Sequence, residues 1–208
     1  MTLVQSIDKV VEWLNENVCS QITLKIPDDY KNDADYNVKL VNPTAFPLYV
    51  PGKERLPPSV PAPIPSVCVQ LMEGKDDLPK SVRQLNIRLC LACWNPGEHG
   101  GEKYHIRNGE GSTGTTSYFL AKGDDAKTYT RNMEGWRDSF NFADLVLREL
   151  ENTEYIAGHR LVKESEIKFG LFTEDGNIWD YYPYWHNWIT FTLEVGVVRN
   201  PKTYENLL

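Results

Sequence analysis

The strongest constraint on the fold of this 208-residue chain is an alternating run near its C-terminal end, from Asn187 to Val198. Side chains in a strand project to opposite faces in turn, so one face of this run is apolar and the other mixed. The apolar face carries Ile189, Phe191, Leu193, Val195 and Val197. The other face carries Trp188, Thr190, Thr192, Glu194 and Gly196. The pattern predicts a half-buried strand, and the rest of the chain must supply its neighbours and a cover.

Two amphipathic segments have the period of helices. In residues 136–151 the apolar positions recur at spacings of four and three, the pattern of a helix with one buried face. That stripe contains Trp136, Phe140, Ala143, Leu147 and Leu150, widened by Phe142, Leu145 and Val146. An earlier segment, residues 5–18, has the same spacing, with Ser6 as its expected N-cap and Asp8 in its first turn. We expect the helix over 136–151 to cover the apolar face of the final strand.

Further alternating runs predict the partner strands. They are a short strand at 22–26, one at 67–71 ended by a turn at 73–77, one at 85–93, and one at 167–171 followed by a hairpin turn at 174–177. Turn residues such as Gly, Asn and Asp bound these runs. We therefore predict an α+β fold, in which a mainly antiparallel sheet is covered on one face by two helices.

Two segments do not fit regular elements. Residues 42–66 hold eight prolines, and because proline cannot donate to a sheet ladder or lie inside a helix, they predict an extended arm. Residues 95–134 are rich in glycine and predict a long flexible loop inserted between a strand and the second helix, with a short strand at 117–121. The whole chain, 1–208, is predicted to be one domain with these two additions.

Composition excludes several classes of function. The net charge of −7 argues against a broad basic surface for nucleic acid. No apolar run reaches the length of a membrane span, and the first residues lack the pattern of a signal peptide. Four scattered cysteines favour a reducing compartment over a disulfide framework.

The candidates for chemistry are sparse. Cys90 and Cys93 form a C-x-x-C, but within an alternating strand they face opposite sides, whereas metal or redox pairs need both sulfurs together. His99 and His105 show no recognised metal-ligand spacing. We therefore predict no catalytic, cofactor-binding or metal-binding residues and no enzyme activity. The alternative of another class is a metal or thiol enzyme that uses Cys90, Cys93, His99 and His105.

A cluster of aromatic residues precedes the final strand. It has two interpretations: core aromatics that close one end of the sheet, or the core of a subunit interface, where Trp and Tyr are favoured. The candidate interface residues are Trp179, Tyr182, Tyr184, Trp185, Trp188, Thr190 and Thr192.

The order of predicted elements, closed by Asp180-Tyr-Tyr-Pro-Tyr-Trp185 running into an alternating strand, resembles the tail terminator proteins of long-tailed bacteriophages. The resemblance implies a structural virion protein at the tail–head junction, assembled in the bacterial cytoplasm. It implies a homo-oligomeric ring, typically a hexamer, with the tail-tube protein and the head–tail connector as partners, and no membrane or specific nucleic acid. The proline-rich arm and the length of the loop depart from the family pattern. They leave a head-completion or minor tail protein as an alternative, alongside a bacterial module that binds a protein partner.

Overall fold

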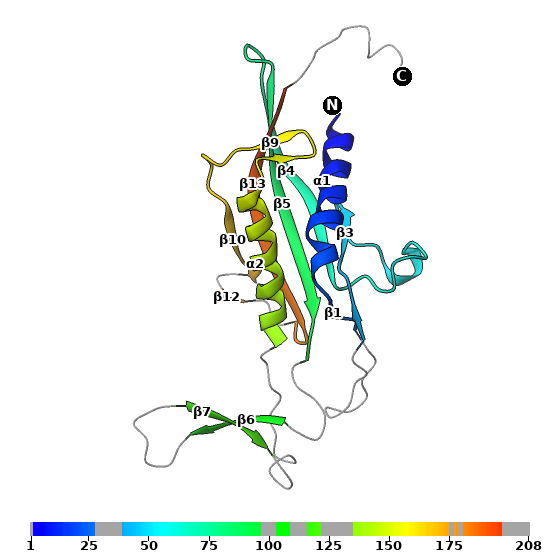
Figure 1. Cartoon of the computed structure of the whole chain (residues 1–208), viewed down its shortest axis with the longest axis vertical. Coiled ribbons are helices and arrows are strands. Elements are labelled where there is room, and N and C mark those ends of the chain that lie inside the picture. The colour runs from blue at the N-terminus through cyan, green and yellow to red at the C-terminus, as the bar shows by residue number, and fades with distance from the viewer. Residues whose placement is uncertain are drawn as a thin grey trace.

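A curled, mainly antiparallel sheet of seven strands, packed against two helices, forms the body of the protein (Figure 1). This computed structural model describes residues 2–27, 39–96, 103–108, 116–121, 135–174, 177–178 and 181–196, with the backbone alone for 103–108, 116–121 and Glu174. The strands of the sheet are β3 (Thr44–Pro47), β4 (Ser66–Asp77), β5 (Val82–Trp94), β8 (Tyr155–Ile156), β9 (His159–Leu161), β10 (Lys168–Leu171) and β13 (Tyr184–Gly196).

The strand order is β3-β4-β5-β13-β9-β8, and β10 also pairs with β13. Only β3 and β4 run parallel. Three two-stranded ladders stand apart from this sheet: β1 (Leu24–Lys25) with β2 (Leu40–Val41), β6 (Lys103–Asn108) with β7 (Thr116–Ala121), and β11 (Thr173–Glu174) with β12 (Asn177–Ile178). Short 3₁₀ turns occupy Cys19–Gln21 and Lys53–Arg55.

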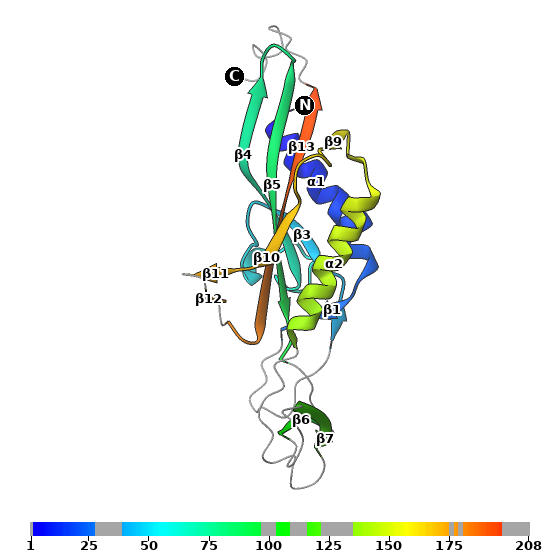
Figure 2. The same cartoon turned by 90° about the vertical axis from the view of Figure 1, so that its left-hand side faces the viewer.

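Strand β13 is the centre of the sheet, as its alternation predicts. It pairs with β5 over its whole length and begins at Tyr184, three residues before the alternating run. Ile189, Phe191 and Leu193 are at most 1% exposed. They lie on the face that α1 (Leu3–Asn17) and α2 (Trp136–Asn152) cover, hereafter the inner face (Figure 2). The opposite side is the outer face.

Helix α1 starts earlier than its apolar spacing predicts. Thr2 is its N-cap: the Thr2 hydroxyl accepts from the Gln5 amide at 3.2 Å, and the Gln5 side chain accepts from the Thr2 amide at 2.9 Å. This reciprocal pair satisfies two backbone donors that a helix start leaves free. The prediction of Ser6 as N-cap is therefore wrong, and Asp8 falls outside the first turn. Ser6 is instead buried inside the helix.

Helix α2 matches its predicted range, but its buried stripe is rotated. The residues that enter the core most completely are Phe142, Val146 and Leu150, spaced four apart on one side of the helix. Trp136 is 38% exposed and Phe140 is half-buried. With 3.6 residues per turn, both lie well away from Phe142 around the helix axis. The cover predicted for β13 is confirmed, with a different set of helix residues at its centre.

The β4–β5 hairpin is longer than the sequence predicts. The expected turn at 73–77 is wrong, because β4 continues to Asp77 and the chain reverses between 78 and 81. Backbone pairing continues past a register shift between Leu71 and Glu73. Asp76 forms an ion pair with Arg83 at 2.6 Å across the two strands. Cross-strand charge pairs of this kind stabilise a polar ladder.

The structure describes all of the predicted arm and only part of the predicted loop. Thr44–Pro47 of the arm is strand β3, at one edge of the sheet, where a proline that lacks an N–H is tolerated. Of residues 95–134, the strand predicted at 117–121 lies within β7, while residues 97–102, 109–115 and 122–134 lie outside the described residues. Neither helix in the described part of the chain has the length and apolarity that a membrane crossing needs.

Candidate subunit interface

Asn95, immediately after β5, joins four parts of the fold. It is 6% exposed. Its side-chain oxygen accepts from Lys25 Nζ at 2.9 Å, and its side-chain nitrogen donates to Asp138 at 2.7 Å. Its backbone N–H donates to the Pro183 carbonyl at 3.0 Å. Asn95 therefore ties the end of β5 to β1, to the first turn of α2 and to the segment before β13.

Two aromatic residues of the predicted cluster close on the same point. Trp185 Nε1 donates to the Asn95 carbonyl at 2.8 Å, and the Tyr182 hydroxyl donates to the Pro96 carbonyl at 2.7 Å. The two rings meet edge to face, with centroids 6.2 Å apart. Aromatic side chains with a polar tip suit such sites, because the ring packs while the N–H or O–H finds a partner.

Gly135 completes this junction by having no side chain. A Cβ at this position would lie 2.0 Å from the Asn95 carbonyl oxygen and 2.9 Å from Trp185 Nε1. Backbone therefore approaches backbone at the point where the chain leaves β5 and where it enters α2. The residues between these two points belong to the predicted loop, so the junction fixes both of its ends.

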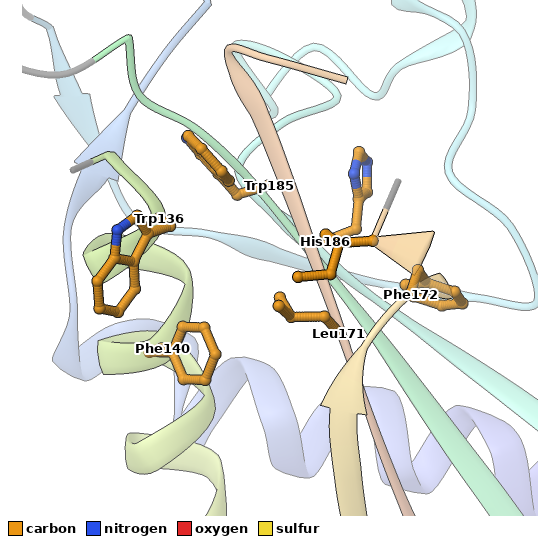
Figure 3. Close-up of a pocket in the computed structure, with 7 residues that line it drawn as sticks. Trp136, Phe140, Leu171, Phe172, Trp185 and His186 are labelled. Carbon is orange, nitrogen blue, oxygen red and sulfur yellow. The ribbon is translucent and has the colours of Figure 1, made fainter. Parts of the chain in front are cut away.

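An apolar pocket opens beside this junction. Its volume is about 290 Å³. Figure 3 shows Trp136 and Phe140 projecting from the first turns of α2, with Leu171 and Phe172 from β10 and the residue after it, and Trp185 and His186 from the start of β13. Ile178 of β12 completes the lining. We call this the β13 pocket.

Two of the residues that line the β13 pocket, Trp136 and Ile178, are exposed. Ile178 is 60% exposed. The guanidinium of Arg137 lies 4.9 Å from the centroid of the Trp136 ring. His186 is the titratable residue among the described lining residues, and burial lowers its pKa. It is therefore neutral at neutral pH. Contiguous exposed apolar surface marks sites that bind proteins, membranes or ligands.

The outer face of β13 has more partners within the chain than the sequence suggests. Trp188 Nε1 donates to the Leu171 carbonyl at 3.0 Å, and its ring lies against Gly170. Glu194 accepts from Gln84 at 3.2 Å and lies 3.7 Å from Arg160. Residues of the same chain therefore contact the outer face at these two positions. Thr192 is half-buried.

The predicted interface residues divide into three groups. Tyr182 and Trp185 lie at the loop junction, and Trp185 also lines the pocket. Four others alternate with the buried positions of β13 and lie on its outer face: Tyr184, Trp188, Thr190 and Thr192. Trp179 lies outside the described residues. The predicted cluster is therefore not one surface.

Sequence reasoning missed most of the pocket and the Asn95 junction. The pocket residues that were not predicted as a site are Trp136, Phe140, Leu171, Phe172, Ile178 and His186. Trp136 and Phe140 were assigned to the core stripe. A buried stripe centred on Phe142, Val146 and Leu150 leaves Trp136 and Phe140 outside the core. Two aromatic residues outside the core stripe are the sequence signal that could have indicated the pocket.

The C-x-x-C pair faces opposite sides of the sheet, as predicted. Cys93 is fully buried on the inner face, and Cys90 lies on the outer face with its thiol donating to Gln70 at 3.4 Å. Burial raises the pKa of both thiols. His99 and the side chain of His105 lie outside the described residues. Within the described residues, no three His, Cys, Asp or Glu side chains gather as metal ligands.

Comparison with known proteins gives no relative for this chain: no family model, no curated protein and no solved structure matches it.

Proposed function

We propose that this chain is a structural protein of bacteriophage tail assembly, a tail terminator whose copies form a ring on the end of the tail tube. The observation that carries the proposal is the β13 pocket, an open apolar hollow lined by aromatic side chains of α2 and β13, by Phe172, and by Leu171 of β10 and Ile178 of β12. Interfaces concentrate their binding energy in such aromatic-lined hollows. The resemblance in element order supplies the family.

The geometry around the pocket supports an assembly role. The Asn95 junction holds the first turn of α2 and the start of β13 together by hydrogen bonds of 2.7–3.0 Å. A pocket whose walls are already fixed loses little conformational freedom when a partner binds. Such preorganisation suits a subunit that must join identical neighbours in one geometry.

The proposal places the protein at the tail–head junction of the virion, with the tail-tube protein on one side of the ring and the head–tail connector on the other. Assembly takes place in the bacterial cytoplasm. A head-completion protein or a minor tail protein is the alternative within the same class. The terminator and these alternatives differ in the surface to which the protein binds.

The test is the mass and shape of the purified protein. Light scattering at tens of micromolar, with negative-stain electron microscopy, is expected to give a discrete ring of several subunits. A strictly monomeric species at that concentration contradicts the proposal. Added to polymerising tail-tube protein, a terminator stops growth at one tube end, whereas a head-completion protein leaves the tube length unchanged.

A further inference from the structure

A second exposed apolar feature lies at the end of β3. Leu48 and Tyr49 follow that strand and are 51% and 68% exposed. Leu48 has a φ of 62°, a left-handed conformation that a branched side chain rarely adopts. The Tyr49 amide donates to the Pro47 carbonyl at 2.7 Å, which closes a tight three-residue turn. We call this the 47–49 turn.

The 47–49 turn is fixed to the sheet. The Leu48 amide donates to the Val69 carbonyl of β4 at 2.8 Å, and Gln70 donates to the Leu48 carbonyl at 3.4 Å. The backbone is therefore held while the two large side chains point into solvent. Strained backbone that the surrounding structure holds in place clusters at binding and other functional segments, and here it carries two exposed apolar side chains.

The 47–49 turn and the β13 pocket lie toward opposite edges of the sheet. Strand β3 is at one end of the order β3-β4-β5-β13-β9-β8, while β10, which contributes Leu171 to the pocket, pairs with β13 on the side away from β5. Figure 1 shows the segment after β3 on one side of the body, and β10 and β12 on the other. One copy therefore cannot insert its own turn into its own pocket.

The two features complement each other in chemistry and in charge. The turn presents an aliphatic and an aromatic side chain, and the pocket is lined almost entirely by such groups. Lys53, Glu54 and Arg55 follow the turn and are exposed, so this segment carries two cations and one anion, a net charge of +1. The segment 173–180, which contains Ile178, has three acidic residues and no basic one. Opposite charges beside an apolar contact steer and orient two partners.

We propose that the 47–49 turn of one copy inserts into the β13 pocket of a second copy. The contact is heterologous, since each copy uses a different surface to bind each neighbour, and repetition of such a contact produces a closed ring when the rotation closes. This inference rests on the proposed ring-forming function. It adds the two surfaces that meet, with Tyr49 and Ile178 at their centres.

The test uses two variants that each disable one surface. Tyr49→Glu puts a charge on the turn and leaves the pocket intact, and Ile178→Glu does the converse. Both side chains are largely exposed, so folding is expected to survive. Each variant alone is expected to be a monomer by sedimentation velocity. Mixed in equal amounts, they are expected to form a dimer of twice the monomer mass, because one intact turn meets one intact pocket.

Met72→Glu is the matched control, since Met72 is also an exposed apolar residue, 46% exposed on β4. This variant is expected to assemble like the wild type. If a glutamate variant unfolds, a photoreactive benzophenone at position 49 replaces it, in a mixture of ¹⁵N-labelled and unlabelled copies. Crosslinks between copies are then expected to join residue 49 to peptides containing Trp136 or Ile178.

The possible results separate the two proposals. A wild type that assembles, together with variants that remain equally assembled or crosslinks that avoid the pocket, overturns the turn-in-pocket contact and leaves the ring standing. Monomeric variants whose mixture stays monomeric also overturn it. A wild type that is monomeric at tens of micromolar overturns both proposals.

Discussion

The contact between α2 and β13 is closed at one end and open at the other. At the closed end, Phe142 and Val146 of α2 and Phe191 of β13 are at most 1% exposed. At the open end, the same two elements present Trp136 and Trp185 to the β13 pocket. Both ends are apolar in sequence, so hydrophobicity alone does not decide which end becomes core.

The difference between the two ends lies in how each end is held. The closed end is stabilised by burial, which is non-directional and removes large side chains from water. The open end is held by directed hydrogen bonds around Asn95. These bonds fix the aromatic residues in place although no other described part of the fold covers them completely. The closed end therefore serves stability, whereas the open end leaves apolar side chains at the surface.

Phe142→Ala at the closed end is expected to have the largest effect. Removing a fully buried phenylalanine leaves a cavity in the core, and such substitutions lower the free energy of unfolding by about 3–5 kcal/mol. Urea denaturation measures the loss. Phe140→Ala, two residues earlier and half-buried, is the control and is expected to lose clearly less. Equal losses would mean that the two ends do not differ.

Gly135→Ala at the open end is expected to have the second largest effect on the free energy of unfolding. The added Cβ would meet the Asn95 carbonyl at 2.0 Å, so backbone must move. Overpacking of this kind lowers stability by about 1–3 kcal/mol. The control is Gly196→Ala, where no atom lies within 4 Å of the new Cβ. If both variants have the same thermal midpoint, the junction is looser than described.

Trp136→Ala is expected to change stability less than assembly. Trp136 meets Phe140 edge to face at 5.4 Å, and the loss of such a pair costs about 0.5–1.5 kcal/mol. Denaturation of dilute protein gives this cost, and sedimentation velocity of concentrated protein gives the assembly effect. A variant that unfolds readily yet assembles normally would place Trp136 in the core.

Acidification gives the mildest test. Burial lowers the pKa of His159 and of His186 from the ordinary value of 6.5. The unfolded chain then binds protons first as pH falls, so the stability present above pH 6.5 is progressively lost between 6.5 and the folded pKa values. Urea midpoints between pH 7.5 and pH 5 report this loss.

His159→Asn removes the contribution of His159, which lies on β9 and contacts α1 and β8. His159 is fully buried, with Nδ1 3.2 Å from the Ile156 carbonyl and Nε2 2.8 Å from the Ser6 hydroxyl. Its replacement is expected to flatten the pH dependence only in part, because the contribution of His186 remains. If the urea midpoint of the variant depends on pH as steeply as that of the wild type, His159 does not contribute to the pH dependence.

Periodicity predicted the parts of the fold in which one residue pattern determines one face. Strand β13 and helix α2 have strong periods and were found where expected. The parallel pairing of β3 with β4 and the pairing of β9 with β13 join segments that are far apart in the chain. Local sequence does not encode those partners, so these pairings could not be predicted.

The candidate site was predictable only through its aromatic residues. Trp185 was identified because it belongs to a dense aromatic cluster. Asn95 gave no signal, because a single asparagine after a strand is ordinary, and its partners lie 43–90 residues away in the chain. The pocket combines four elements, and its shape follows from their packing. Such a site becomes visible only when the chain is folded.

The most direct test of the central claim is amide hydrogen exchange across a concentration series. Peptides covering 135–141 and 171–178 are expected to gain protection as concentration rises, because a second copy covers the open end. Peptides covering 142–150 and 189–193 are expected to be protected throughout. Protection that is independent of concentration at both ends, or that rises only on the outer face at 86–90, would contradict the claim.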